Sequence, residues 1–330
     1  MKGKILVTGA SGFIGRRLVR RLLQSGADVR CLLRPAAPVH AALRGAEIAR
    51  GDLLDRASLA AAARGARAVV HCAALVRPQW AVVTRGRLER EYFAVNAGGT
   101  LNAARAAEEA GAGLFLHLSS IAAQGPGVSL RESDPCRPLT LYGRSKLASE
   151  EAALKGVPPG SGCRLVIARP AMIYGADSPS WGRFFSAVRG GLVPLPGRGH
   201  NTLSVCWAEN LVDALLLLAE KGEDRGVYAV SEGPRSWEEM ALLSAAALGV
   251  KPRLLRVPER PLGLLSAASA AALRAAGLVV PSVNYIAEPG SFREAVSSWG
   301  HDVSRLAGLG WTPRLDTRAA LAAELAGGGV

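Results

Sequence analysis

The chain has few aromatic residues and few cysteines, and it lacks the sequence features of disulfide-rich, metal-binding and secreted proteins. Only 5% of its 330 residues are aromatic, and its five cysteines show neither CxxC spacing nor Cys/His metal-ligand spacing. Their isolation and odd number indicate free buried thiols in a reducing compartment, with no disulfide framework and no metal site. The N-terminus has no charged region followed by an apolar stretch and a cleavage site, so we expect a cytoplasmic protein.

Acidic residues are also scarce relative to basic ones. The formal net charge is +13, and the excess comes from arginines scattered along every segment, with only six lysines and no basic run. Proteins that track nucleic-acid phosphates concentrate such charge in a patch or an arm. We therefore expect no nucleic-acid partner, whereas phosphorylated cofactors are compatible with this charge.

Short β-rich runs alternate with helical patterns through the first two thirds of the chain, from KILVTGA to CRLVIARP. Such alternation is typical of βαβ units and a parallel sheet. Because the chain exceeds the usual size of one hydrophobic core, we predict an α/β fold with two parts. A Rossmann-type doubly wound parallel sheet would occupy 1–172 and 202–231, and a smaller, mostly helical C-terminal substrate domain would occupy 173–201 and 232–330.

The segment 262–283 is nearly uncharged and long enough to approach a membrane span. It is rich in Ala and Ser and contains Gly277 and Pro281, which argues against spanning. We favour a helix that is buried or lines the substrate site, and membrane contact is the alternative.

A glycine-rich loop, TGASGFIG, follows the first predicted strand and opens a helix of alternating arginine and leucine. Gly9 permits the tight turn, Gly12 lets the backbone approach a pyrophosphate, and Gly15 lets the helix pack on the strand. This context predicts a dinucleotide site, with cofactor contacts from Gly9, Ser11, Gly12, Phe13, Ile14 and Gly15.

The end of the second predicted strand, VRCLLRP, lacks the acid that binds the ribose hydroxyls of NAD. Arg34 stands where the extra phosphate of NADP would lie, although Arg30, Arg16 or Arg17 could equally serve. We predict NADP as the cofactor, with NAD as the alternative.

Two further turns are expected beside the cofactor. Asp52, followed by Leu53, is suited to accept a hydrogen bond from the adenine amino group; its alternative role is a helix cap, which Asp55 fits better. The small residues Ala73 and Ala74 would let the dinucleotide lie across the strand ends.

A phenol and an ammonium group lie four residues apart at Tyr142 and Lys146, on one face of a predicted helix. A phenol with a pKa of about 10 is a poor base at neutral pH, and a neighbouring cation favours the phenolate. Lys146 would supply that cation and bond a ribose hydroxyl, while Ser120, at a strand end, would donate to the substrate oxygen. The set predicts protonation of a carbonyl that receives hydride, or the reverse.

With these motifs the chain resembles the extended short-chain dehydrogenase/reductase family, also called the NAD-dependent epimerase/dehydratase family. The motifs stand in family order along essentially the whole chain: TGASGFIG, GDLLD, HCAA, VNAGGT, SSIAAQG, YGRSK and ARPAMIYG. The resemblance implies a homodimer joined near residues 93–111 and 142–155. It assigns the catalytic serine to Ser120 and implies roles at the cofactor site for Asn96, which would support the backbone, and for Ser119, Pro170 and Ile173.

Departures from the family pattern reduce the number of reactions and substrates to be expected. Ser120-Ile121-Ala122 replaces the Thr-Asp-Glu of sugar-nucleotide dehydratases, so elimination of water is not expected, and the Asn that epimerases carry after Arg169-Pro170 is missing. The loop LPGRGHNTLSV and the closing LGWTPRLDTRAALAAEL look most similar to the 3β-hydroxysteroid dehydrogenase and dihydroflavonol-reductase branches. We predict an NADP-dependent dehydrogenase/reductase acting on CH–OH groups of an apolar, steroid- or lipid-like substrate that contacts Trp80, Met172, Trp181 and Phe185.

Other interpretations stay open. Core packing is the plain alternative for each of the proposed substrate residues. A nucleotide-sugar epimerase would keep the same Ser, Tyr and Lys, and a non-catalytic NADP-sensing protein would need the fold but not the reacting groups. The presence of Tyr142 and Lys146 speaks against the last.

Overall fold

The computed structural model describes residues 3–76, 83–276, 278–279 and 289–325, and its centre is a seven-stranded sheet. The strand order is β12-β8-β6-β4-β1-β2-β3, and all neighbouring pairs are parallel. These strands are β1 (Lys4–Thr8), β2 (Val29–Leu33), β3 (Glu47–Arg50), β4 (Ala66–His71), β6 (Leu114–Leu118), β8 (Arg164–Pro170) and β12 (Gly226–Val230). The chain starts at β1 and winds outward in both directions, which confirms the predicted Rossmann-type fold.

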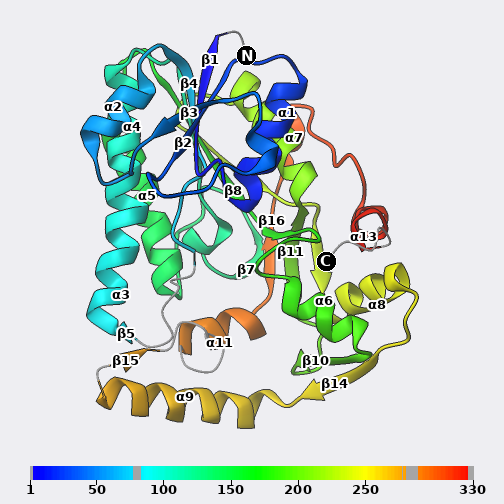
Figure 1. The fold of residues 1–330 in the computed structure, drawn as a ribbon. Coiled ribbons are helices and arrows are strands. Elements are labelled where there is room, and N and C mark those ends of the chain that lie inside the picture. Colours follow the sequence, from blue (N-terminus) through cyan, green and yellow to red (C-terminus); the bar gives the residue numbers. More distant parts are fainter. Residues whose placement is uncertain (1–2, 77–82, 277, 280–288, 326–330) are drawn as a thin grey trace.

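Helices cover both faces of this sheet (Figure 1). One face carries α1 (Phe13–Gln24) and α7 (Ala208–Lys221), which contact each other. The other face carries α2 (Arg56–Ala63), α4 (Gly99–Glu109) and α5 (Leu141–Gly156), with the π-helical turn η2 (Phe93–Gly98) before α4. Three residues each form the short helices η1 (Ala41–Leu43) and η3 (Ile121–Ala123). Because both faces are covered, the strands are nearly continuous apolar runs.

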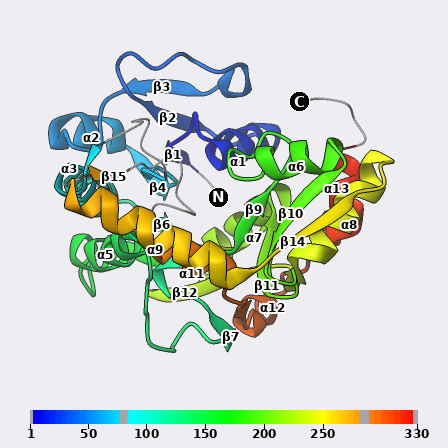
Figure 2. The same ribbon diagram turned by 90° about the horizontal axis from the view of Figure 1, so that it is seen from below.

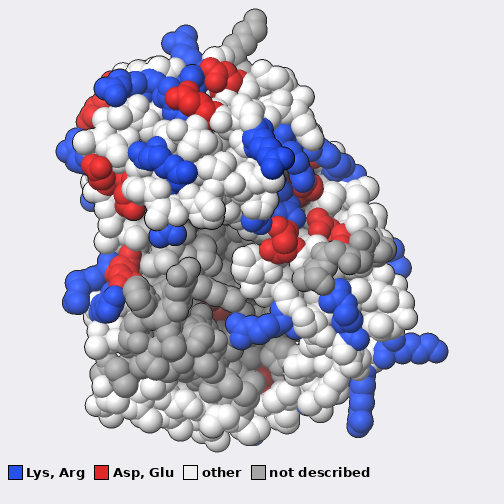
Figure 3. Space-filling view, viewed as in Figure 1, with Lys and Arg blue, Asp and Glu red and all other residues white. Residues whose placement is uncertain are grey.

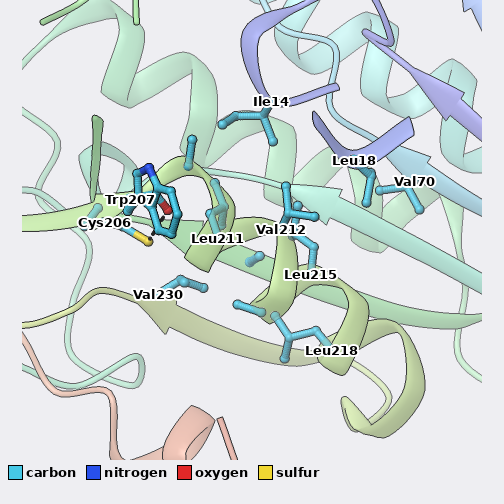
Figure 4. Packing of buried hydrophobic residues seen from close by; sticks show 14 of the residues in the cluster. Ile14, Leu18, Val70, Cys206, Trp207, Leu211, Val212, Leu215, Leu218 and Val230 are labelled. Carbon is cyan, nitrogen blue, oxygen red and sulfur yellow. Dashed lines mark hydrogen bonds between the residues drawn. The ribbon is translucent and has the colours of Figure 1, made fainter. Parts of the chain in front are cut away.

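The core between α7, α1 and the sheet is shown in Figure 4. Leu211, Leu215 and Leu218 of α7 are fully buried, and they lie near Leu18 of α1 and Val230 of β12. Each such side chain contributes about 1.5–3 kcal/mol when it is removed from water. This packing holds the first helix, and therefore the glycine loop before it, against the sheet.

Outside the large sheet, short strands pair locally. A three-stranded sheet has the order β13 (Pro234–Ser236), β11 (Thr202–Trp207), β9 (Met172–Tyr174); β10 (Leu192–Pro196) pairs with β14 (Arg253–Val257), β16 (Trp299–His301) with β7 (Gly127–Leu130), and β15 (Leu278–Val279) with β5 (Val83–Thr84). The segment 202–231 that we assigned to the nucleotide domain is therefore divided, because β11 pairs with β9 and β13 while α7 and β12 join the large sheet.

The other helices are α3 (Arg85–Tyr92), α6 (Gly182–Arg189), α8 (Trp237–Leu248), α9 (Glu259–Ala275), α11 (Pro289–Val296), α12 (Ser304–Gly308) and α13 (Thr317–Leu325). Seen from below, α9 and β14 lie across the front of the molecule (Figure 2). Helix α9 contains the first part of the segment 262–283, for which we favoured a helix that is buried or lines the substrate site. Leu264, on the outer side of α9, is nevertheless 73% exposed. In the described part of the chain no helix is both long and apolar enough to cross a membrane.

Candidate active site

The glycine loop between β1 and α1 is shaped by close backbone approaches. Gly9 has a φ of +67°, and a Cβ added there would lie 2.6 Å from the backbone nitrogen of Ala73. A Cβ on Gly15 would lie 2.1 Å from the carbonyl oxygen of Gly9. Gly12 is the N-cap of α1, and no side chain caps that helix. The helix N-terminus therefore presents uncapped N–H groups at a small-residue loop, which suits a pyrophosphate.

The other predicted contacts in this loop differ in exposure. Ser11 and Gly12 are exposed, whereas Phe13 is partly buried beneath the guanidinium of Arg17, 4.3 Å from its ring centre. Ile14 is buried in the core, so only its backbone is placed to meet a cofactor.

The turn after β4 is held by a buried chain of hydrogen bonds. His71 Nδ1 lies 2.7 Å from Thr8 Oγ1, and its Nε2 lies 3.0 Å from Thr100 Oγ1. Burial lowers the pKa of His71 to about 3, so the ring is neutral. His71 therefore packs between sheet and α4, and it places Ala73 directly against Gly9.

Asn96 connects this turn to the catalytic helix. Its Oδ1 accepts from the N–H of Leu75 at 2.7 Å, and its Nδ2 donates to the Leu75 carbonyl at 2.9 Å and to Ser145 Oγ at 2.8 Å. The side chain is 1% exposed. Asn96 thus supports the backbone of the turn at Leu75 and links it to the Ser145 hydroxyl on α5, as the predicted supporting role requires.

The four arginines considered for the cofactor phosphate differ in whether their guanidinium groups already have partners. Arg30 binds Glu47 and two carbonyls, while Arg16 and Arg17 both pair with Asp177. Arg34 is exposed, and within the described residues its guanidinium has no hydrogen-bond or ion-pair partner. Of the four arginines we considered, Arg34 alone is both at the strand end and available for a phosphate.

Asp52 follows β3 and is partly buried. Its Oδ1 accepts from the N–H of Leu54 at 2.9 Å, which stabilises the turn, whereas Asp55 caps α2 by accepting from Ala57 at 3.0 Å. Leu53 lies against Gly99: a Cβ added to Gly99 would be 2.9 Å from the Cβ of Leu53. The helix cap is therefore Asp55, as expected, and Asp52 keeps a second carboxylate oxygen beside the strand ends.

The three predicted reacting groups converge. Ser120 follows β6 and caps η3, with its Oγ accepting from the N–H of Ala122, and its hydroxyl lies close enough to Tyr142, in the first turn of α5, to lower the pKa of that phenol. Lys146, one turn further along α5, is 1% exposed and donates from Nζ to the carbonyl of Leu118 at 2.8 Å. Residues from a strand end and from one face of a helix therefore form a single cluster.

A glycine that sequence reasoning did not single out makes this convergence possible. A Cβ on Gly143 would lie 2.4 Å from the carbonyl oxygen of Ala122. The N–H of Gly143 also donates to Thr140 Oγ1 at 3.1 Å, which caps α5. The start of α5 thus rests on the loop that carries Ser120. Its position between the Tyr and the Lys was the available signal.

The electrostatics of the cluster depend on its burial. Burial lowers the pKa of Lys146 to about 8, while the carboxylate of Glu150 opposes that fall, so the ammonium form still prevails at neutral pH. Burial raises the pKa of Tyr142 to about 12; the hydrogen bond from Ser120 opposes the rise and the Glu294 carboxylate adds to it. Tyr142 is therefore a neutral phenol, ready to donate a proton. The N-terminus of α5 favours the phenolate that results by roughly 0.3–1 kcal/mol.

A buried ion pair behind the cluster was not predicted. Glu150 lies on the same face of α5 as Tyr142 and Lys146, four residues beyond the lysine, and it accepts from Arg169 Nε at 2.9 Å and Nη2 at 2.7 Å. Ser119 Oγ donates to the same carboxylate at 2.5 Å. The hydroxyl of Ser119, for which we predicted a cofactor contact, is thus occupied in this network and 4% of the residue is exposed.

Glu294 of α11 is the second residue that the sequence did not reveal. It accepts from Thr140 Oγ1 at 3.0 Å and is close enough to raise the pKa of Tyr142. An acid from the C-terminal part of the chain therefore touches the cap of the catalytic helix. It lies more than 150 residues from Tyr142, and no local motif pointed to it.

The predicted substrate residues separate into different environments. Trp181 and Phe185 are 4% and 3% exposed and belong to an aromatic cluster with Phe184 and Trp237, in which ring centres lie 5.2–6.0 Å apart. Tertiary packing of α6 against α8 buries both side chains, which matches the core-packing alternative considered for them, and contact with a substrate stays a prediction. Met172, in β9, is partly exposed, and so is Ile173; Pro170 ends β8 in the core. Trp80 lies outside the described residues.

Comparisons with known proteins agree with this site. The model of the NAD dependent epimerase/dehydratase family matches residues 5–231. A ceramide reductase of Caulobacter vibrioides is 32% identical over 272 residues, covering 81% of this chain and 76% of that one. A 3-beta-hydroxysteroid dehydrogenase of Mycolicibacterium neoaurum is 29% identical over 271 residues, covering 78% and 74%. The solved structure of MoeE5 in complex with UDP-glucose and NAD superposes with a TM-score of 0.75, 27% identity and coverage of 98% and 97%.

The chain therefore belongs to the NAD-dependent epimerase/dehydratase family of extended short-chain dehydrogenases/reductases. Its relatives include enzymes named for acting on hydroxyl or keto groups, which supports an oxidoreductase and confirms the predicted similarity to the 3β-hydroxysteroid dehydrogenase branch. The family is NAD(P)-dependent, and solved structures similar to this chain hold NAD.

Proposed function

We propose that this protein is an NADP-dependent dehydrogenase/reductase that interconverts a secondary alcohol and a ketone on an apolar substrate. The observation that carries the proposal is the convergence of Ser120, Tyr142 and Lys146 near the turn after β4, where Cys72 interacts with Lys146 and the next residue, Ala73, lies against Gly9. When bound, the nicotinamide cofactor supplies or accepts the hydride.

The residues account for the proton. In reduction, Tyr142 donates its phenolic proton to the carbonyl oxygen of the substrate as that oxygen gains charge, and Ser120 donates a hydrogen bond to the same oxygen. The Lys146 ammonium stabilises the phenolate that remains, and its Nζ has further donors for a ribose hydroxyl beyond the one given to Leu118. Oxidation of the alcohol is the reverse of these steps.

NADP rather than NAD is favoured by charge at the end of β2. No acid is present there, and Arg34 is exposed and unpaired within the described chain, whereas Arg16, Arg17 and Arg30 are occupied. A charge-assisted hydrogen bond to a phosphate contributes about 1.5–3 kcal/mol. The structure therefore offers a ready partner for the 2′-phosphate.

An apolar substrate is favoured by the names of the relatives and is compatible with the apolar packing around Tyr142. Leu88, Tyr92 and Leu141 form a buried apolar cluster, and Leu75 and Tyr142 pack against it. The ring of Tyr92 lies 6.3 Å from that of Tyr142. The ceramide reductase and steroid dehydrogenases among the relatives are named for lipid-like substrates.

Cofactor preference can be tested with steady-state kinetics. We expect NADPH to have a lower KM than NADH, and Arg34→Ala to raise the NADPH KM roughly 10- to 100-fold while leaving the NADH KM unchanged, as 1.4 kcal/mol corresponds to tenfold. Arg44→Ala, another exposed arginine without a partner among the described residues, is the matched control. Equal KM values for both cofactors in the wild type would show that the assignment of NADP is wrong.

The reaction itself can be tested with apolar ketones and the preferred cofactor. Tyr142→Phe keeps the ring and removes the proton donor, so turnover should fall at least a hundredfold. Turnover that survives this change would contradict the proposed chemistry. Tight binding of a UDP-sugar in calorimetry, together with inactivity on apolar ketones, would favour the epimerase, for which the MoeE5 complex with UDP-glucose is the relevant neighbour.

A further inference from the structure

The outer side of α9 is an apolar stripe that no other part of the described chain covers. Leu264 and Leu265 are 73% and 54% exposed, and Ala268, Ala271 and Ala272 are exposed along the same side. These positions recur every three to four residues, as the exposed face of a helix requires. From 261 to 273 the sequence has no charged residue. A solvated helix face is normally polar, so this one has the character of a contact surface.

The opposite side of α9 is already occupied. Gly263 faces α11, where an added Cβ would lie 3.2 Å from the ring of Phe292, and Ser266 and Ala270 are buried. The helix is therefore anchored by its inner side, and its outer side points away from the molecule. In Figure 1 it forms the lower edge of the protein.

A second set of exposed apolar side chains lies on the two-stranded sheet whose strand β14 leads into α9. Leu192 pairs with Arg253 and Pro194 with Leu255, and all four are exposed on the same face of that sheet. Leu192 and Leu255 are 50% and 49% exposed, while the alternate residues Val193 and Leu195 are buried. We call the exposed side chains Leu192, Pro194, Leu255, Leu264 and Leu265 the apolar rim.

Basic side chains flank the apolar rim at the N-terminal end of α9. Arg253 shares the exposed face of β14 with Leu255, Arg260 stands in the first turn of α9, and Lys251 precedes β14, whereas Arg256 projects from the other face of the strand and pairs with Glu238. Arg198, Arg256 and Arg260 line an open depression of about 650 Å³ together with Glu259. Arg256 is paired with Glu238, and Arg198 and Arg260 have no partner among the described residues.

Figure 3 shows the same arrangement on the surface. The lower edge, where α9 runs, is free of blue and red side chains, and blue side chains project at its right-hand end below the position of β14. Toward the top of this face, by contrast, blue and red side chains are mixed.

We propose that the apolar rim and its flanking arginines dock on the surface of a bilayer containing anionic phospholipids. The leucines would enter the boundary between headgroups and acyl chains, and the arginines would meet lipid phosphates. Since no described helix is able to span, the contact is an interfacial one. A protein partner would have to present a surface without polar groups to this apolar stripe. Lipid acyl chains carry no polar groups and therefore match it directly. The docking would bring the site to a phase in which apolar substrates concentrate.

The test is cosedimentation of the purified full chain with vesicles of phosphatidylcholine alone or with added phosphatidylglycerol. The wild type should bind the anionic vesicles and lose binding at high salt. Arg253→Gln/Arg260→Gln should weaken binding roughly 30-fold, because each basic residue near the surface contributes about fivefold, or about 1 kcal/mol. Leu264→Asp/Leu265→Asp should weaken it at least tenfold. Leu242→Asp, a 48% exposed leucine on α8, is the matched control and should bind as the wild type does.

Three results would overturn the proposal. The wild type could stay in the supernatant with anionic vesicles at low salt, or Leu242→Asp could lose binding as fully as the rim variant. The wild type could also be a dimer by light scattering that Leu264→Asp/Leu265→Asp converts to a monomer, which would make the rim an interface between copies. Reduction of a water-soluble ketone should be unchanged in the rim variant, so the docking and the proposed enzyme activity can fail separately.

Discussion

Replacing Glu150 with glutamine tests the buried network behind the active site. Glu150 and Arg169 are each 4% exposed, and the carboxylate accepts two hydrogen bonds from the guanidinium and one from Ser119. Glutamine keeps the size but leaves the guanidinium charge without a counter-ion. Breaking a buried pair from one side costs about 3–5 kcal/mol. Because the amide still offers one acceptor oxygen, we expect a loss of about 3 kcal/mol in the free energy of unfolding.

The same substitution has a second, independent consequence. The charge of Glu150 raises the pKa of Lys146 against the effect of burial, which has lowered it to about 8. Without that charge the pKa falls further, and the ammonium is lost at a lower pH. If the ammonium is needed to stabilise the phenolate, the alkaline limb of the kcat/KM profile should move to lower pH.

Urea denaturation followed by circular dichroism measures the first effect, and pH-dependent kinetics measure the second. Glu151→Gln is the matched control, because Glu151 is the adjacent exposed carboxylate on α5. It should change the free energy of unfolding by less than about 0.5 kcal/mol. A Glu150→Gln variant that loses less than about 1 kcal/mol, with an unmoved alkaline limb, would refute the inferred network.

Three further predictions follow from individual contacts. Gly143→Ala should lower kcat roughly a hundredfold while the protein still folds, because the new Cβ would lie 2.4 Å from the Ala122 carbonyl oxygen and must displace Tyr142 from Ser120; Gly182→Ala, which meets nothing within 4 Å, is the control, and equal rates in the two variants would contradict the prediction. Glu294→Gln should lower the pKa of Tyr142 and shift the pH dependence of kcat/KM accordingly, since the carboxylate raises that pKa; an unmoved profile would exclude the contact. Stability should fall as the pH drops below about 6.5, because the unfolded chain binds protons that buried His71 and His117 do not bind in the fold; for His71, whose pKa burial lowers to about 3, the loss should be about 2 kcal/mol between about pH 7.5 and about pH 5. A constant urea midpoint across that range would contradict this.

Much of the fold and of the catalytic set was predictable because it depends on local pattern. The strand-to-helix loop from Gly9 to Gly15 carries its own geometric signature, and the spacing of Tyr142 and Lys146 places them on one helix face whatever surrounds them. The alternation of strands and helices specified a parallel sheet before any contact was known.

The sequence could not show which apolar residues are buried where that depends on packing between segments far apart in the chain. Trp181 and Phe185 would be apolar whether they contact a substrate or pack in the core. Only the position of α8 shows that they pack in an aromatic cluster of the core. Likewise, the uncharged stretch 261–273 of α9 favoured burial, yet Leu264 and Leu265 are exposed, whereas Gly263, on the other side of the helix, lies against α11.

The sequence by itself determined the class of sheet, the glycine loop before the first helix and the placement of Tyr142 and Lys146 on one helix face, since each depends on residues close together in the chain. Only the tertiary structure decided which of four arginines is free at the end of β2, which carboxylate supports Lys146, and that Glu294 reaches the catalytic helix from far along the chain. The physical reason is that charge pairing and burial depend on distances through space, and the chain sets those distances only when its long-range contacts form.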